Sequence, residues 1–248
     1  MKPEHMETIV GICLIFIFIA AEKRRPIADT NKRLHLRLDI IGFVAIFMFG
    51  RLSRYTLNEI GTTLSQFATE FLTAIHQTYA YLPSFSRVVL AIIMVDFCLY
   101  WIHRFMHLKW FWRFHVWHHS VEQLYWFSGF RASFVHTFLF LTPQILLIYL
   151  LGLTRLETIS AFTFGVFIQF WQHTNYNLTF GRLDRWIMTP RYHRLHHAKN
   201  QYVDKNFGTV LVIWDRMFGT YVDPATADLR VKLGLKTQPN LARMIIGV

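Results

Sequence analysis

The sequence predicts an all-α integral membrane protein with about four to five transmembrane helices and a cytoplasmic, histidine-rich helical cap. Three observations lead to this fold class. The 248 residues are 53% hydrophobic and 17% aromatic, and the mean hydropathy of +0.28 is high for a soluble domain. The apolar residues are gathered into runs that are typical of membrane helices. Most of the 13 histidines are grouped, and the groups lie near the ends of these runs.

The N-terminal region, residues 1–87, is predicted to be a membrane anchor. Its first run, "TIVGICLIFIFIAA" (8–21), is followed by the basic cluster at 23–25. A signal peptide carries its charge before the apolar core, so this run is interpreted as a retained anchor. A second run covers 38–50, and the more polar residues 57–82 predict an amphipathic or partly immersed helix.

The remaining apolar runs belong to a predicted catalytic region at 88–223, which precedes a C-terminal tail at 224–248. They cover 88–102, 134–153 and 157–171, each with the length and composition of a candidate span. Beyond the last run the chain becomes polar, so we expect the tail to leave the membrane.

The basic loop at 22–37 determines the predicted orientation, because short loops rich in Lys and Arg stay in the cytoplasm. The short link at 154–156 holds a single arginine, which suits the opposite side. Counting spans from the basic loop brings His103, His136 and His173 to the cytoplasmic face. We therefore expect a multi-pass membrane protein with its histidine site on that face.

Nine grouped histidines are the candidate metal ligands. Residues spaced i, i+3 and i+4 share one face of a helix. Imidazoles held side by side cannot all be charged, and neutral imidazole is a good ligand for Fe, Zn or Cu. The candidates are His103 and His107 in "HRFMH", His115, His118 and His119 in "HVWHH", His173 in "QHTN", and His193, His196 and His197 in "HRLHH".

The number of candidates predicts two metal ions, because four to six ligands satisfy one transition metal. An all-histidine shell leaves iron, zinc and copper open on physical grounds. The sequence has no His-Glu-x-x-His motif of a zinc peptidase, and haem would use only one or two of these histidines. These observations favour non-haem iron with oxygen chemistry.

Four segments resemble the fatty acid hydroxylase superfamily, also called the sterol desaturase family. They are "DFCLYWIHRFMH", "FHVWHHS", "QHTN" and "TPRYHRLHHAKNQYVDKNFGTVLVIWDRMFGTY", and the resemblance covers about residues 90–223. It implies an integral membrane oxygenase in which the nine histidines bind two Fe ions. It also implies that O2 is used to hydroxylate or desaturate a C–H bond of a lipid, whether sterol, fatty acyl chain, carotenoid or alkyl ether. The alternative from another class is a non-catalytic, histidine-rich membrane protein that binds zinc.

Five further residues are candidates for roles at or beside the metals. Asp96, inside an apolar run, is expected to accept a hydrogen bond from the second nitrogen of a ligand or to form a salt bridge between helices. Asn175 or Asn177 is expected to hold a water on iron. His136 is a candidate ligand, or a support for one, or a packing residue, and Asp204 is expected to close the site or to meet a redox partner.

The partners expected from the sequence are a lipid substrate, the membrane and an external electron donor. The chain has no glycine-rich dinucleotide fingerprint and only two cysteines, both in apolar runs, so a ferredoxin, a cytochrome or a reductase is expected to supply electrons. A basic cytoplasmic surface suits an acidic donor. The net charge of +11 borders the apolar runs and no recognition motif is present, so nucleic acid is not an expected partner.

Overall fold

The computed structural model describes residues 3–33, 35–237 and 240–247, and within these ranges the regular secondary structure is helical. Strand pairing there is limited to two isolated bridges, Ile187–Leu211 and Ala198–Leu233. The elements are α1 (Pro3–Arg24), α2 (Leu36–Phe67), α3 (Thr69–Ala80), α4 (Ser84–Met106), α5 (Trp112–His119), η1 (Trp126–Phe130), α6 (Phe134–Leu151), α7 (Arg155–His173), η2 (Gly181–Arg185), α8 (Pro190–His196), α9 (Ile213–Met217) and α10 (Leu241–Ile246).

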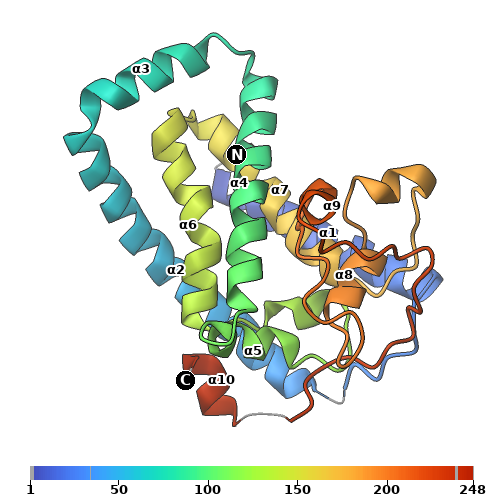
Figure 1. Cartoon of the computed structure of the whole chain (residues 1–248). Helices are drawn as coiled ribbons and strands as arrows, with labels where there is room; N and C mark the ends of the chain where they lie inside the picture. Colours follow the sequence, from blue (N-terminus) through green and yellow to red (C-terminus); the bar gives the residue numbers. More distant parts are fainter. Residues whose placement is uncertain (1–2, 34, 238–239, 248) are drawn as a thin grey trace.

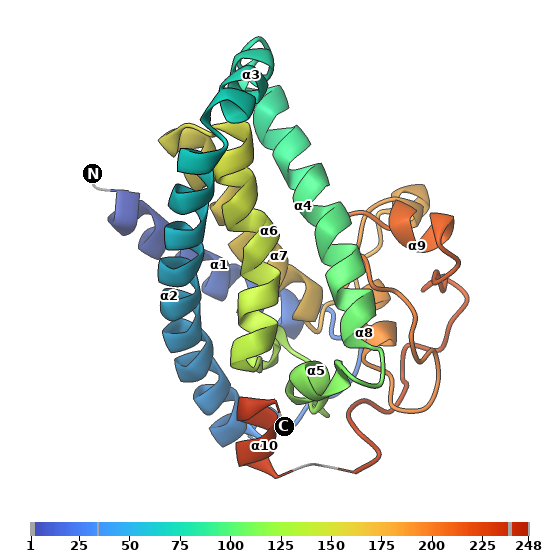
Figure 2. The same cartoon turned by 60° about the vertical axis from the view of Figure 1, so that its left-hand side comes forward.

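The long helices form a bundle around α6. Helix α6 packs against α2, α3 and α4, and α7 packs against α1, α4 and α8. The short helices α5, α8 and α10 gather where α4 ends and α6 begins (Figures 1 and 2). The same end of the bundle therefore receives the end of α4, the start of α6 and the polar segments that carry the histidine motifs.

Two described helices, α4 and α6, are long and apolar enough to cross a membrane. Large apolar side chains are also exposed on other helices, including Phe47 of α2 at 63% and Phe71 of α3 at 64%. Exposed apolar side chains of this size indicate contact with something other than water. Membrane association is thus supported by two candidate spans, while the count of four to five spans and the cytoplasmic cap stay predictions.

The predicted separation between the second apolar run and an amphipathic helix at 57–82 is wrong in its boundary. Helix α2 continues unbroken to Phe67, and the chain turns at Ala68, whose φ of −110° and ψ of 27° are not helical. Nothing between the two predicted elements breaks a helix, because Gly50 is tolerated within one and no proline occurs there. The amphipathic part is divided between the end of α2 and α3.

The basic loop after α1 packs against the histidine-bearing end of the bundle. Glu22 Oε1 accepts hydrogen bonds from the backbone N–H groups of Trp126 at 2.8 Å and Asn175 at 2.9 Å. The backbone N–H of Asn31 donates to Gln123 Oε1 at 3.1 Å. The loop that sets the predicted orientation and the polar end of the bundle therefore lie on the same side of the molecule.

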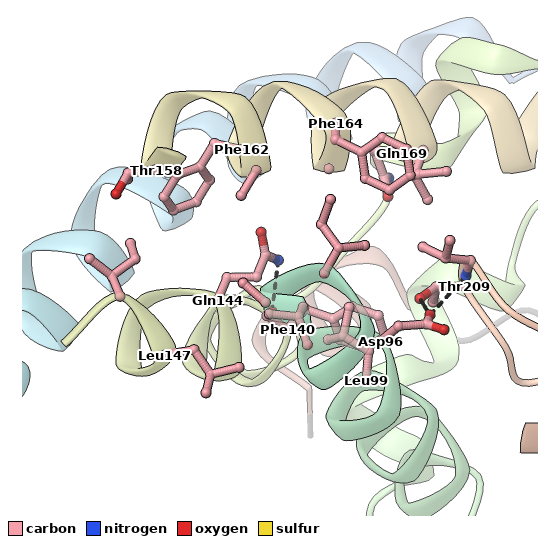
Figure 3. A pocket seen from close by; sticks show the side chains of 18 of the residues that line it. Asp96, Leu99, Phe140, Gln144, Leu147, Thr158, Phe162, Phe164, Gln169 and Thr209 are labelled. Atoms are coloured by element: carbon pink, nitrogen blue, oxygen red, sulfur yellow. Dashed lines mark hydrogen bonds between the residues drawn. The ribbon is translucent and has the colours of Figure 1, made fainter. Parts of the chain in front are cut away.

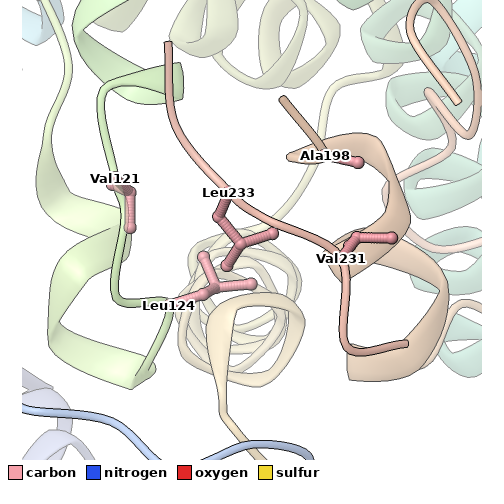
Figure 4. Close-up of a cluster of buried hydrophobic side chains, with 5 residues drawn as sticks. All are labelled: Val121, Leu124, Ala198, Val231 and Leu233. Carbon is pink, nitrogen blue, oxygen red and sulfur yellow. The ribbon is translucent and has the colours of Figure 1, made fainter. Parts of the chain in front are cut away.

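The C-terminal segment is packed onto this end rather than extending from it. Val231 and Leu233 join Val121, Leu124 and Ala198 in one buried apolar cluster (Figure 4). Val121 and Leu124 follow the first doubled histidine motif, and Ala198 directly follows the second. The cluster thus joins the two motifs and the segment after residue 223 in one packed unit.

Candidate metal centre

The nine candidate histidines meet at the polar end of the bundle and fall into two groups. In each group every residue offers one ring nitrogen, and these nitrogens lie within 4.8 Å of one another. The first group, called group one, consists of His103, His107, His115, His119 and His196; the second, called group two, consists of His118, His173, His193 and His197. The groups have the sizes of two coordination shells built from imidazole.

Each doubled motif is shared between the two groups. In the motif on α5, His115 and His119 belong to group one and His118 to group two. The motif on α8 is divided the opposite way, with His196 in group one and its two neighbours in group two. Positions i and i+4 differ by about 40° around a helix, whereas i+3 turns about 60° the other way. Each helix can therefore face one metal position with two rings and the other with one.

Hydrogen bonds on the outer sides of the rings determine which ring nitrogen is unprotonated and keeps its lone pair free. His118 Nδ1 lies 3.3 Å from the carbonyl oxygen of Arg131, and His173 Nδ1 lies 3.0 Å from that of Gln169. A carbonyl only accepts, so each Nδ1 carries the proton of a neutral ring and each Nε2 keeps a free lone pair. These two Nε2 atoms face each other at 3.2 Å. Two lone pairs at this separation repel unless a cation lies between them.

Group one has the same arrangement. His103 Nδ1 is 2.9 Å from the carbonyl oxygen of Phe207, and His196 Nδ1 is 2.8 Å from that of Lys205. His196 Nε2 is then a bare acceptor, and it is buried without a hydrogen-bond partner among the described residues. His103 Nε2 lies 3.0 Å from His115 Nε2. Outer acceptors that fix the ring tautomer are a general feature of histidines that bind metals.

Burial keeps the imidazoles neutral. His115, His173 and His197 are fully buried. Burial lowers the pKa of His118, His193 and His197 well below the usual value for histidine, and the neighbouring imidazoles lower it further. A cluster of neutral, converging nitrogens fits a transition metal, and the donor set suits Fe, Zn or Cu.

Comparison with known proteins agrees with this geometry. Residues 88–220, more than half of the chain, match the family described as fatty acid hydroxylase. The chain belongs to the fatty acid hydroxylase family. The matched region contains all nine candidate ligands. The resemblance in the histidine-bearing segments is thereby confirmed.

Several curated proteins are similar to this member of the fatty acid hydroxylase family. Alkylglycerol monooxygenase of Danio rerio is 39% identical over 141 residues, which are 53% of this chain and 30% of that protein. Ornithine lipid hydroxylase OlsE of Rhizobium tropici is 38% identical over 146 residues, 57% of this chain and 44% of that protein. The human alkylglycerol monooxygenase is 34% identical over 143 residues, 53% and 29% of the two chains. The chain thus spans less than half the length of these relatives, and no solved structure matches it.

Two of the five additional candidates contact candidate ligand histidines. His136 lies outside both groups, and its Nδ1 is 3.1 Å from Nδ1 of His115. Asp204 Oδ1 accepts a hydrogen bond from His107 Nδ1 at 2.9 Å. Asp204 has a positive φ of 56°, which aspartate tolerates better than most residues. Both side chains contact the outer nitrogen of a candidate ligand, so they orient a ring rather than offer a further metal position.

Asp96 and the two asparagines are placed differently from our expectation. Asp96 accepts hydrogen bonds from Thr209 Oγ1 and Trp214 Nε1 and from the backbone N–H groups of residues 210 and 211, at 2.6–2.9 Å. It anchors the segment after α8 to α4 and reaches neither a ligand ring nor a basic side chain among the described residues. The sequence showed a buried acid but not its partners, because these come from a segment more than a hundred residues away.

Neither asparagine faces the metal groups. The side chain of Asn175 bonds with the basic loop, accepting from the backbone N–H groups of Ile27 and Ala28 and donating to the carbonyl of Ala28 at 2.7 Å. Asn177 is exposed, and its backbone N–H donates to the carbonyl of Arg25 at 2.7 Å. The predicted role of holding a water on iron does not suit either position, because both serve to fasten the loop after α1.

One supporting pair was missed by sequence reasoning. Asp39 of α2 and Arg131 form a buried ion pair with an N–O distance of 2.6 Å, and Tyr125 Oη donates to the same carboxylate at 2.7 Å. The backbone carbonyl of Arg131 is the acceptor that orients His118. An acid within the apolar run at 38–50 was the available signal, since such residues are costly in a membrane segment and tend to be functional.

Two openings adjoin the centre from different sides. The first is a mainly apolar pocket between α4, α6 and α7, in which Leu99, Phe140 and Phe164 face one another with Gln144 and Gln169 (Figure 3). The ring of Phe140 is 5.8 Å from the ring of His103 and 4.5 Å from that of His136, between centroids. The second is a polar pocket bounded by three histidines of group one.

The polar pocket is strongly basic. Its walls include group-one residues His107, His119 and His196, together with one acid, Asp204. The basic side chains around them form a set that we call the basic rim: Lys109, Arg113, Lys199, Lys236 and Arg243. A polar molecule can therefore approach group one without passing through the apolar pocket.

Proposed function

We propose that this chain is a membrane-bound di-iron oxygenase that hydroxylates a C–H bond in the alkyl part of a lipid. The observation that carries the proposal is the pair of histidine groups with converging, unprotonated nitrogens, which adjoin an apolar pocket through the ring of Phe140. Membership in the fatty acid hydroxylase family supports it. The names of the relatives, alkylglycerol monooxygenase and ornithine lipid hydroxylase, favour hydroxylation over desaturation and a lipid with a polar head.

Two irons, one held by group one and the other by group two, would supply the binding and reduction of O2. In the overall reaction one oxygen atom enters the C–H bond as a hydroxyl group, and the other leaves as water. The reaction therefore also consumes two electrons and two protons, which reduce the second oxygen atom to water. The residues of the chain contribute by keeping the rings neutral, fixing each tautomer and separating the reacting carbon from bulk water.

The apolar pocket is the proposed lipid site. Its walls come from α4 before His103, from α6 after His136 and from α7 before His173, so each wall leads toward the centre. An alkyl chain lying along these walls would bring one of its carbons beside Phe140, whose ring contacts two histidine rings. Positioning of this kind is what selective oxidation of an unactivated C–H bond requires.

The membrane orientation follows as part of the proposal. The basic loop at 22–37 is bonded to the segments that carry the histidines, through Glu22 and Asn175. Loops rich in Lys and Arg remain cytoplasmic, so a centre on the same side faces the cytoplasm in a multi-pass arrangement. In a chain whose Cys13 and Cys98 are replaced by Ser, the variants Asp29→Cys and Asp228→Cys should both be modified by a thiol reagent from the cytoplasmic side. Labelling of the two positions from opposite sides would contradict this orientation.

The electron donor is proposed to approach group one at the basic rim. Its basic side chains line the same pocket as three candidate ligands, and opposite charge speeds and orients association between redox partners. A ferredoxin, a cytochrome or a reductase with an acidic surface has the required chemistry. The apolar lipid and the polar donor would then reach the centre from separate sides.

The function is tested with purified protein in detergent or nanodiscs, loaded anaerobically with iron. Reduced protein should convert an alkylglycerol, such as hexadecylglycerol, into a product that carries one atom from ¹⁸O-labelled O2. Zinc-loaded protein is the matched control and should give no product. Equal metal binding without any oxygen incorporation, across alkylglycerol, ornithine lipid and acyl substrates, would favour the alternative of a zinc-binding membrane protein.

A further inference from the structure

The apolar pocket between α4, α6 and α7 contains a buried polar atom that has no partner among the described residues. Gln172 of α7 lines this pocket directly before candidate ligand His173, and only 6% of it is exposed. Its side-chain Oε1 is buried and unpaired. Leaving such an acceptor unsatisfied is unfavourable, and buried polar groups nearly always have a partner. An unpaired acceptor on the wall of a ligand pocket therefore indicates a donor on the ligand.

Neighbouring hydrogen bonds show that the unpaired atom is the oxygen and not the nitrogen. The carbonyl of Gly129 can only accept, so the group of Gln169 that lies 2.8 Å away must be its Nε2. The Oε1 of Gln169 then accepts from Gln172 Nε2 at 3.1 Å. This chain of amides ends at Gln172 Oε1, and its direction is set by the backbone. Only an O–H or N–H group can complete it.

Two other polar side chains of the pocket, Gln144 and Asp96, already have partners. Gln144 Nε2 donates to the carbonyl of Phe140 at 3.0 Å, as drawn in Figure 3. Asp96 is surrounded by four donors, one of them Thr209 (Figure 3). Gln172 differs from both because its acceptor is buried and unused, and because it adjoins a candidate ligand in sequence.

We propose that Gln172 is a specificity-determining residue that accepts a hydrogen bond from an O–H or N–H group of the bound lipid. That the bound lipid is the substrate of an oxygenase rests on the proposed function. The pocket would thereby select lipids that carry a donor close to the oxidised part of the chain over plain hydrocarbon chains of equal length. A site built to bond with a polar group discriminates strongly against an analogue that lacks it.

The test is a binding measurement that needs no turnover. Zinc-loaded protein in nanodiscs is titrated with hexadecylglycerol and with hexadecyl propyl ether, which has the same chain and ether oxygen but no donor. Displacement of a fluorescent alkyl probe from the pocket reports the affinity. For the native chain we expect the alkylglycerol to bind at least about tenfold more tightly than partition into the nanodisc alone explains, the size of one good hydrogen bond. Equal affinities for the two lipids, after correction for their partition into the nanodisc, would overturn the proposal. They would indicate that a water donates the hydrogen bond to Gln172 Oε1.

Two variants locate the effect. Gln172→Met keeps the length of the side chain and removes the acceptor, so the affinity ratio of the two lipids should fall to about one through weaker binding of the alkylglycerol. Gln66→Met, at an exposed position of α2 outside the pocket, is the matched control and should leave the ratio near its native value. Metal content of both variants is measured in the same samples. A Gln172→Met protein that keeps its metals and loses affinity equally for both lipids would also overturn the proposal.

This experiment separates the inference from the proposed function. Zinc does not support oxygen chemistry, so the lipid preference is measured whether or not the iron-loaded chain is an oxygenase. Preference for the donor-bearing lipid without any oxygenation would support the role of Gln172 and reject the oxygenase. Oxygenation without a preference for the donor-bearing lipid would support the oxygenase and reject the role of Gln172.

Discussion

The rings of His119 and His197 stack on each other with their centroids 4.6 Å apart and their planes inclined by 27°, although they belong to different groups of ligand nitrogens. The two rings come from the ends of α5 and α8, which are held together by the apolar cluster of Figure 4. The two proposed metal positions are therefore adjacent. They remain chemically distinct, because group one has five candidate ligands and group two has four.

The unequal size of the groups predicts unequal consequences of losing one ligand. His173→Ala leaves three rings in group two, so we expect iron content to fall from about two ions per chain to about one. His107→Ala leaves four rings in group one, a number that still suits a transition metal, so both ions should remain, bound more weakly. Metal analysis of both variants after identical iron loading measures the difference. The same iron content in the two variants would contradict this division into groups.

His136→Ala tests the support of His115. The variant removes the partner of the outer nitrogen of His115 but leaves all nine candidate ligands in place. Loss of such a partner typically weakens metal binding by about 10–100-fold. Chelator competition should therefore show one ion that is removed more easily and one that is unchanged. Loss of an ion without chelator would make His136 a ligand, and native behaviour would make it a packing residue.

Gly129 is required by the close approach of η1 to His173. A Cβ at this position would lie 2.4 Å from Cγ and Nδ1 of the imidazole, which is far inside contact distance. Gly129→Ala should displace that ring and lower the occupancy of group two, with at least a tenfold loss of turnover. Gly50→Ala is the control, because nothing lies within 4 Å of its Cβ position. Metal content and product formation are measured for both, and unchanged occupancy in Gly129→Ala would be contrary to the structure.

Asp96→Ala should destabilise the fold around the centre. It leaves one buried and three partly buried donors without their acceptor. Each such loss costs about 1–3 kcal/mol for a buried donor and less for a partly buried one, so the sum is smaller than four times this value. We expect the free energy of unfolding to fall by about 3 kcal/mol or more, seen as a lower midpoint of thermal unfolding in detergent. Exposed Asp228→Ala is the matched control and should change the midpoint little. A midpoint equal to the native one would show that the anchoring by Asp96 contributes little.

The basic rim predicts a defect that depends on the donor protein. Lys109→Glu with Arg113→Glu reverses two exposed charges beside group one. Turnover supported by an acidic donor should fall by about tenfold at low salt and should lose its salt dependence, because opposite charge steers association. Reduction by dithionite should support the same product yield as in the native protein. Arg182→Glu, an exposed charge outside the rim, is the control, and an equal defect with dithionite would place the effect at the centre instead.

Local sequence determined much about this protein. The spacing of the histidines selected eight of the nine residues that the structure brings together, all except His173, because i, i+3 and i+4 positions on a helix share a face whatever the helix packs against. The apolar runs indicated the long helices for a different reason. A helix long and apolar enough to cross a membrane can be identified from its length and composition alone. Family membership likewise followed from the residues flanking the motifs.

The tertiary structure decided the relations between distant segments. Which ring joins which group depends on how α5 and α8 face each other, and the partners of Asp96, Asn175 and Asp39 come from segments far away in the sequence. The unpaired oxygen of Gln172 is visible only once Gly129 and Gln169 fix the direction of the amide chain. A periodic pattern records the face of one helix, whereas a hydrogen bond across the fold leaves no mark on the spacing of either partner. For this reason the chain by itself indicated its candidate ligands and its long helices, and only the packed structure showed how the candidate ligands are divided and hydrogen-bonded.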